Sequence, residues 1–178
     1  MIRRIFSMAI FLAFISCSDN SDESKDLESN KDSTSPETAQ PTPNLRVKDD
    51  NLNAIYQHYI HLTTALIDGN FNEAKLAANA IETGAKELKP GTALAGSAIT
   101  VASAGDLEAQ RTAYSALSNE MITLVKQAGV ENGELYVEYC PMAMNDKGAS
   151  WISGSKEIRN PYFGEKMMNC GEVKEVIK

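Results

Sequence analysis

Apolar residues in the middle of the chain recur at helical spacing, in segments that turn residues separate. In residues 51–67 the inward positions fall three or four apart, which places them on one face of a helix. They are Leu52, Ile55, Tyr56, Tyr59, Thr63, Leu66 and Ile67. Asp49 or Asp50 can cap the start of this helix, and the run Asp-Gly-Asn at 68–70 predicts its end.

Three further helices are expected before residue 130. Asn70, with Glu73 three residues on, resembles a capping box and predicts a second helix paired with the first across a short turn. The small residues of "TALAGSAITVASAG" permit a closely packed third helix. Asp106 begins a fourth helix that ends at Gly129, with Leu107, Tyr114, Leu117, Met121, Ile122 and Val125 inward. The sequence therefore predicts a mainly α fold, a small bundle of three to four helices with a short C-terminal β or irregular sulfur-rich segment.

The pattern changes after residue 133, where "ELYVEYC" alternates as a strand does. If the extended conformation continues through Pro141, as the residue before a proline prefers, then Cys140, Met142 and Met144 share one face. The apolar Leu135, Val137 and Tyr139 occupy the opposite face. We therefore expect this sulfur to lie on the side of the strand away from the core.

The N-terminus has the pattern of an export signal. In "MIRRIFSMAIFLAFISC", two arginines precede an apolar stretch and a small residue precedes Cys17. The apolar stretch is shorter than the roughly 20 residues of a membrane-spanning helix. The small residue and cysteine resemble the lipobox of bacterial lipoproteins, which implies lipidation of Cys17. A plain cleaved signal and an uncleaved anchor are the alternatives.

The chain divides into three parts on this evidence. Residues 1–17 are the expected lipoprotein signal peptide. Residues 18–50, rich in Ser, Asp, Glu, Lys, Thr and Pro, offer too little apolar surface to offset chain entropy, and are expected to form a disordered acidic tether. Residues 51–173 are expected to form the helical bundle domain with its Cys/Met segment. We expect an exported protein, lipid-anchored to the cell envelope at the outer membrane, on its periplasmic or surface face.

The net charge of the chain indicates which classes of partner it can bind. Over 178 residues the formal net charge is -7 and the pI is near 4.9. Nucleic-acid binding requires basic surface that neutralises phosphates, so it is not expected. Cations are drawn toward an acidic surface.

Two short stretches, "EYCPMAMNDKG" and "GEKMMNCGE", concentrate the sulfur of the chain. Thiolate and thioether sulfurs are soft donors that suit copper(I) or silver(I). The candidate metal ligands are Cys140, Met142, Met167, Met168 and Cys170, with Met144 weaker. The Gly, Ser, Asn and Pro content of "GASWISGSKEIRNPYFGEK" permits a return that brings the two stretches together. Two alternatives stay open: a structural Cys140–Cys170 disulfide, and methionines that only fill the core.

Other polar residues give weaker signals. His58 and His61 lie three residues apart on the first helix and could together bind a metal ion. They project away from the apolar stripe of this helix, so they become ligands only if the C-terminal tail folds over the face on which they lie. No nucleophile elbow, phosphate loop or metalloprotease helix is present, and Cys-Pro-Met-Ala is not Cys-x-x-Cys, so no enzyme is predicted. Trp151, Tyr162 and Phe163 are expected to be local core.

The tail "YVEYCPMAMNDKGASWISGSKEIRNPYFGEKMMNCG", preceded by "DLEAQRTAYSALSNEMITLVK", resembles a bacterial exported or lipoprotein domain of unknown function, family 3347. The resemblance covers about residues 51–171. That domain also occurs at the C-terminal end of periplasmic adaptor subunits of heavy-metal efflux systems. The resemblance implies an accessory role in copper or silver handling, through Cys140, Met142, Met167 or Met168, and Cys170. A metal-efflux adaptor or a copper carrier is the partner that it implies, and a non-catalytic interaction domain held by a disulfide is the alternative.

Overall fold

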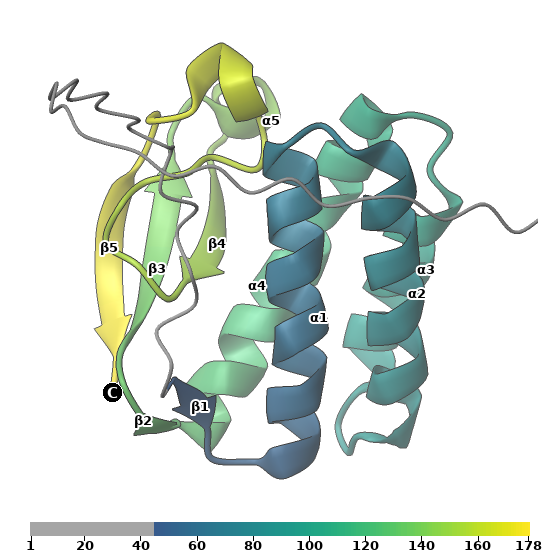
Figure 1. The fold of residues 1–178 in the computed structure, drawn as a ribbon, viewed down its shortest axis with the longest axis vertical. Coiled ribbons are helices and arrows are strands. Elements are labelled where there is room, and N and C mark those ends of the chain that lie inside the picture. Colours follow the sequence, from purple (N-terminus) through teal and green to yellow (C-terminus); the bar gives the residue numbers. More distant parts are fainter. Residues whose placement is uncertain (1–44) are drawn as a thin grey trace, which may run out of the picture. The chain divides into compact units, whose positions relative to one another are not determined.

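The computed structural model describes residues 45–178 of the chain. These residues form a four-helix bundle followed by a small three-strand antiparallel sheet, which confirms the predicted fold class (Figure 1). The expected signal peptide, the lipidation of Cys17 and nearly all of the expected tether lie outside the described residues and stay predictions.

The bundle consists of α1 (Asp50–Ile67), α2 (Phe71–Glu87), α3 (Thr92–Ser103) and α4 (Leu107–Ala128). Each helix packs against the next along the chain, and α4 returns to contact α1 (Figure 1). Among the described residues, no helix is both long enough and apolar enough to cross a membrane.

The starts of α1, α2 and α4 are capped by residues that the sequence singled out, but the capping box expected at Asn70 and Glu73 is only half formed, because the Asn70 N–H donates to the Ala65 carbonyl. The side chains of Asp49, Asn70 and Asp106 each accept a hydrogen bond from a backbone N–H in the first turn, at 2.7, 3.2 and 2.8 Å. The Glu73 carboxylate lies 3.2 Å from His61 Nε2. The Asn70 cap therefore orders the start of α2, while Glu73 links α2 to α1.

The sheet has the strand order β4-β3-β5, with β3 (Leu135–Cys140) in the centre and β4 (Ala149–Ser153) and β5 (Glu172–Ile177) antiparallel to it. β4 lies beside α4, and β5 is the outermost strand (Figure 1). A separate two-strand ladder joins β1 (Arg46–Val47) to β2 (Val130–Asn132). Of these strands the sequence predicted β3 alone, because only β3 alternates clearly.

Both faces of β3 are buried, so the expectation that Cys140 lies away from the core was wrong. Cys140 has 0% of its surface exposed. It shares a face with Trp151, because Glu138 pairs with Trp151 and lies two residues from Cys140. The return segment, residues 154–171, covers this face, where the Tyr162 ring lies 6.0 Å from the Trp151 ring. Because both faces of β3 are covered, the Cys140 sulfur is not exposed to solvent.

The strand does not continue through Pro141, which is a second correction. β3 ends at Cys140, since a proline has no N–H to donate to the ladder. A turn and the short helix α5 (Ala143–Asp146) follow. Met142 and Met144 therefore leave the line of the strand and share no strand face with Cys140.

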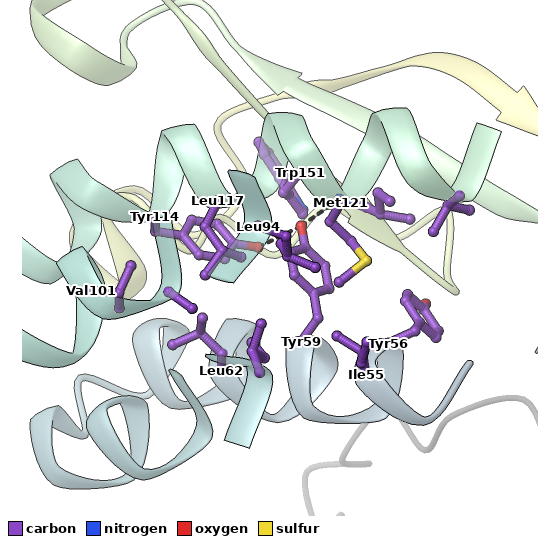
Figure 2. Packing of buried hydrophobic residues seen from close by; sticks show 14 of the residues in the cluster. Ile55, Tyr56, Tyr59, Leu62, Leu94, Val101, Tyr114, Leu117, Met121 and Trp151 are labelled. Carbon is purple, nitrogen blue, oxygen red and sulfur yellow. Dashed lines mark hydrogen bonds between the residues drawn. The ribbon is translucent and has the colours of Figure 1, made fainter. Parts of the chain in front are cut away.

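The hydroxyl of Tyr59 on α1 joins the bundle to the sheet. It makes hydrogen bonds with Ser118 Oγ (2.8 Å) and Tyr114 Oη (2.7 Å) on α4, and it accepts one from the backbone N–H of Ile152 on β4 (3.0 Å). The Tyr59 and Tyr114 rings stack with their centroids 5.7 Å apart, and their hydroxyls meet in the core (Figure 2). One buried oxygen thus connects two helices and a strand.

Tyrosine hydroxyls also satisfy the free edge of β4. Ser150 and Ile152 direct their backbone groups to the edge that β3 does not cover. The Ile152 N–H donates to Tyr59, and the Ser150 carbonyl accepts from the Tyr162 hydroxyl at 2.6 Å. Two backbone groups on this edge are therefore already hydrogen-bonded within the molecule.

We predict that Tyr59→Phe lowers the free energy of unfolding by about 2–3 kcal/mol, because the buried Ile152 N–H and Ser118 hydroxyl lose their partner. Urea unfolding followed by circular dichroism measures this. Tyr56→Phe is the control, since the Tyr56 ring is also buried and its hydroxyl lies outside this network. An equal loss in both variants would show that the network does not hold the sheet on the bundle.

Candidate functional site

The structure brings the two cysteines of the C-terminal half together. Cys140 is the last residue of β3, and Cys170 lies two residues before β5, its neighbour in the sheet. Their Sγ atoms are 2.6 Å apart, longer than the roughly 2.05 Å of a disulfide bond but closer than two unbonded sulfur atoms normally stand. Cys140 is fully buried and Cys170 is partly exposed. We call these two sulfur atoms the sulfur pair.

Asn160, fully buried in the return segment, holds the chain around Cys170. Its Nδ2 donates to the Cys170 carbonyl (2.7 Å), and its Oδ1 accepts from the Tyr162 N–H (2.8 Å). Its own N–H donates to the carbonyl of Met168 (2.8 Å). Sequence reasoning missed this role, although Asn-Pro is a turn signal that marks the position.

Gly171 sets the distance of Cys170 from the sheet. Its φ is +153°, and a Cβ there would lie 2.9 Å from Cη2 of Trp151 and 3.2 Å from the Tyr139 carbonyl oxygen. The backbone passes so closely over the indole that a larger residue forces it outward. The segment that contains Cys170 therefore packs against the ring of Trp151, which is only 1% exposed.

The candidate methionines lie in the segments that flank the sulfur pair. Met142, two residues after Cys140, is 47% exposed. Met167 and Met168 are half-buried at the end of the 3-10 helix η1 (Gly164–Met167), and the Met167 carbonyl accepts from the Cys170 N–H at 3.1 Å. Met144 is half-buried and packs against the core. Met142 is thus the most accessible thioether of the four.

A left-handed turn follows the Cys-Pro-Met sequence directly. Met144, Asn145 and Asp146 have φ values of 55°, 55° and 63°. Residues other than glycine enter this region at a cost of roughly 1–3 kcal/mol each when they are held there. Gly148, also at positive φ, donates its N–H to the Ala143 carbonyl (2.9 Å) and closes the turn. Three residues shortly after Cys140 in the sequence are therefore held in a costly backbone conformation.

The histidine candidates lie elsewhere, on the exposed face of α1. Both His58 and His61 are exposed, and His61 contacts Glu73. Across residues 45–178, no three His, Cys, Asp or Glu side chains gather in a way that could hold a metal ion. A metal in this part of the chain would therefore depend on methionine sulfur beside the two cysteines.

The proximity of the thiols changes the acidity of Cys170. The hydrogen bond with Cys140 raises the pKa of Cys170, and burial acts in the same direction. The backbone N–H of Met142, directed at the Cys170 sulfur, acts the other way and is outweighed. When reduced, Cys170 is therefore a neutral thiol at neutral pH, and an incoming cation must displace its proton.

Glu138 is a buried carboxyl that sequence reasoning placed on the polar side of β3. It is 0% exposed, and neither oxygen has a hydrogen-bond partner of good geometry among the described residues. Burial raises the pKa of Glu138 to about 8, an effect that the nearby Trp151 indole only partly offsets. Glu138 therefore stays protonated at neutral pH.

Comparison with protein families matches the helical part of the chain to a model described as "Protein of unknown function (DUF3347)". Residues 55–133 are a DUF3347 domain. The match to DUF3347 ends before β3, so it covers α2, α3, α4 and most of α1, while the sulfur pair lies beyond it. Comparison with curated proteins and with solved structures gives no match to this chain.

We predict that Asn160→Ala releases the Cys170 segment. The variant loses the donor to the Cys170 carbonyl and the acceptor of the Tyr162 N–H, so the free energy of unfolding falls by about 2–3 kcal/mol. The reduced Cys170 thiol should also react faster with a maleimide. Asn160→Asp is the matched variant, since it keeps the acceptor but sets a carboxylate oxygen against the Cys170 carbonyl. If both variants keep the wild-type Cys170 reactivity, Asn160 does not position that thiol.

We further predict that Glu138→Gln removes part of the pH dependence of stability. The unfolded carboxyl has a pKa near 4.5 and the folded one a pKa of about 8, so its contribution is complete below pH 4.5 and is lost as the pH rises through 8. From pH 5 to pH 9 the Gln variant should gain about 4 kcal/mol over wild type. Urea unfolding across this range measures it, with the exposed Glu157→Gln as control. Parallel curves for wild type and Glu138→Gln would contradict the buried protonated carboxyl.

Proposed function

We propose that the protein is an exported, lipid-anchored module that binds one Cu(I) or Ag(I) ion through Cys140 and Cys170, accessory to heavy-metal handling or efflux. The observation that carries the proposal is the sulfur pair itself. Two thiols 30 residues apart in sequence lie with their Sγ atoms 2.6 Å apart at one end of a sheet. Met142, an exposed residue two positions after Cys140, offers a thioether from the adjoining segment.

The donor chemistry favours a soft monovalent cation. Thiolate and thioether sulfur bind Cu(I) in preference to hard cations, which want oxygen. A structural zinc site takes four ligands, usually Cys and His, and no group of three or more His, Cys, Asp or Glu side chains among the described residues could hold a metal ion. Met142 and one methionine of the pair Met167 and Met168 would complete a sulfur shell.

The fit requires one movement. A metal–thiolate bond is about 2.3 Å long for zinc, so two thiolates on one ion of similar size stand roughly 3.8 Å apart. The sulfur pair is closer than that. Cys140 is fixed inside the sheet, whereas Cys170 is partly exposed and precedes its strand. Cys170 would therefore shift outward to admit the ion.

The accessory role rests on charge and on the resemblance of the tail. The net charge of -7 raises the local concentration of cations. A lipid on Cys17 followed by a long tether would keep the domain near the membrane surface, within reach of a metal-efflux adaptor or a copper carrier. The module would hold or transfer the ion without chemical turnover.

The same 2.6 Å separation favours a second candidate, a non-catalytic interaction domain held by a Cys140–Cys170 disulfide. A disulfide between the end of β3 and the start of β5 would close a loop of about 30 residues and stabilise the sheet. Counting free thiols in protein isolated from the cell envelope separates the two. Free Cys140 and Cys170 favour the metal site, and their absence favours the bridge.

We predict that replacing both Cys140 and Cys170 with serine weakens Ag(I) or Cu(I) binding on the order of 100-fold or more, because thiolates neutralise the cation and hydroxyls do not. Met142→Leu should weaken binding by roughly tenfold or less without changing the fold. Met121→Leu, deep in the helical core, is the control and should bind as wild type does. Titration of the reduced protein against a chromogenic chelator gives these affinities. Wild-type affinity in the double serine variant would exclude the site.

A further inference from the structure

The two members of the sulfur pair differ in access to solvent. Cys140 is 0% exposed and lies between the covered faces of the sheet, next to the buried Ala143 and Ala149. Cys170 is partly exposed and follows the exposed Asn169. An external reagent can therefore react directly with Cys170, whereas Cys140 can react only by exchange with Cys170.

We infer that the pair is a reversible thiol–disulfide switch, in which Cys170 exchanges with an exported dithiol or disulfide protein and Cys140 resolves the exchange. The effect of the switch rests on the proposed function: the reduced pair would bind the soft cation, and the disulfide-bonded pair would not. The partner is defined by its chemistry, as a protein with an exposed redox-active cysteine pair.

The oxidation step balances as two successive exchanges. The Cys170 thiolate attacks the partner's disulfide, one partner thiolate leaves, and a mixed disulfide forms on Cys170. The Cys140 thiolate then attacks the Cys170 sulfur and expels the second partner thiolate. Two electrons pass to the partner, whose disulfide becomes a dithiol, and two protons leave Cys140 and Cys170. Reduction is the reverse, with a partner thiolate attacking Cys170 and Cys140 leaving.

The surrounding contacts suit both states. With Sγ atoms 2.6 Å apart, bond formation needs only a small movement. Asn160 holds the Cys170 carbonyl at 2.7 Å and Gly171 rests on Trp151, so the backbone keeps its place while the side chain changes partner. Cys140 stays within reach of Cys170 throughout, because it is the last residue of the central strand. These are the properties of a resolving cysteine.

The test compares Cys140→Ser and Cys170→Ser in the full chain. Each reduced variant is incubated with oxidised glutathione and digested with trypsin, which places the two cysteines in separate peptides, since lysines stand at 126, 147, 166 and 174. Glutathione should couple to Cys170 of the first variant at least about tenfold faster than to Cys140 of the second, because only Cys170 is accessible. Urea-denatured samples control for intrinsic reactivity and should react at similar rates.

A second arm measures Ag(I) binding by wild type before and after oxidation with glutathione disulfide, and again after dithiothreitol. Binding should be lost on oxidation and regained on reduction. Equal coupling rates in the two folded variants, or no coupling in either, would overturn the switch. If coupling is confined to Cys170 but the reduced protein binds no Ag(I), the switch stands and the proposed metal function falls.

Discussion

The buried hydroxyl of Tyr59 is the contact on which the placement of the sheet depends. It binds Ser118 and Tyr114 of α4 and accepts the Ile152 N–H of β4, so a single oxygen fixes a strand against two helices. β4 in turn pairs with β3, which ends at Cys140. The position of the buried thiol is therefore set by the same network that holds the bundle together, and Cys140 is the rigid half of the site.

Cys170 is the adjustable half. Its place comes from contacts within the return segment, chiefly Asn160 on its carbonyl and Gly171 on the Trp151 ring. These contacts leave the thiol partly open, whereas Cys140 is enclosed. One fixed and one accessible sulfur is an arrangement that serves cation capture and disulfide exchange alike.

The helices could be predicted from sequence because their signals are local. The 3.6-residue spacing of residues such as Ile55 and Tyr59 and the caps at Asp49, Asn70 and Asp106 do not depend on distant contacts. The burial of Cys140 could not be predicted from sequence, because the alternation along β3 does not show that the return segment covers the outer face of this strand. Asn160 and Glu138 were missed for the same reason, and β5 because its charged residues hide its alternation. The two cysteines were expected together, but their unequal exposure is a tertiary property.

The match to DUF3347 describes the bundle, and the sulfur pair is carried by the sheet that follows it. The proposed function therefore depends on what binds at that sheet. The decisive measurement is X-ray absorption at the copper edge, on the reduced protein loaded with one equivalent of Cu(I). We expect a first shell of sulfur only, from Cys140, Cys170 and methionine. Nitrogen scatterers of the imidazole type, as His58 or His61 would give, or the absence of an ordered sulfur shell, would contradict it.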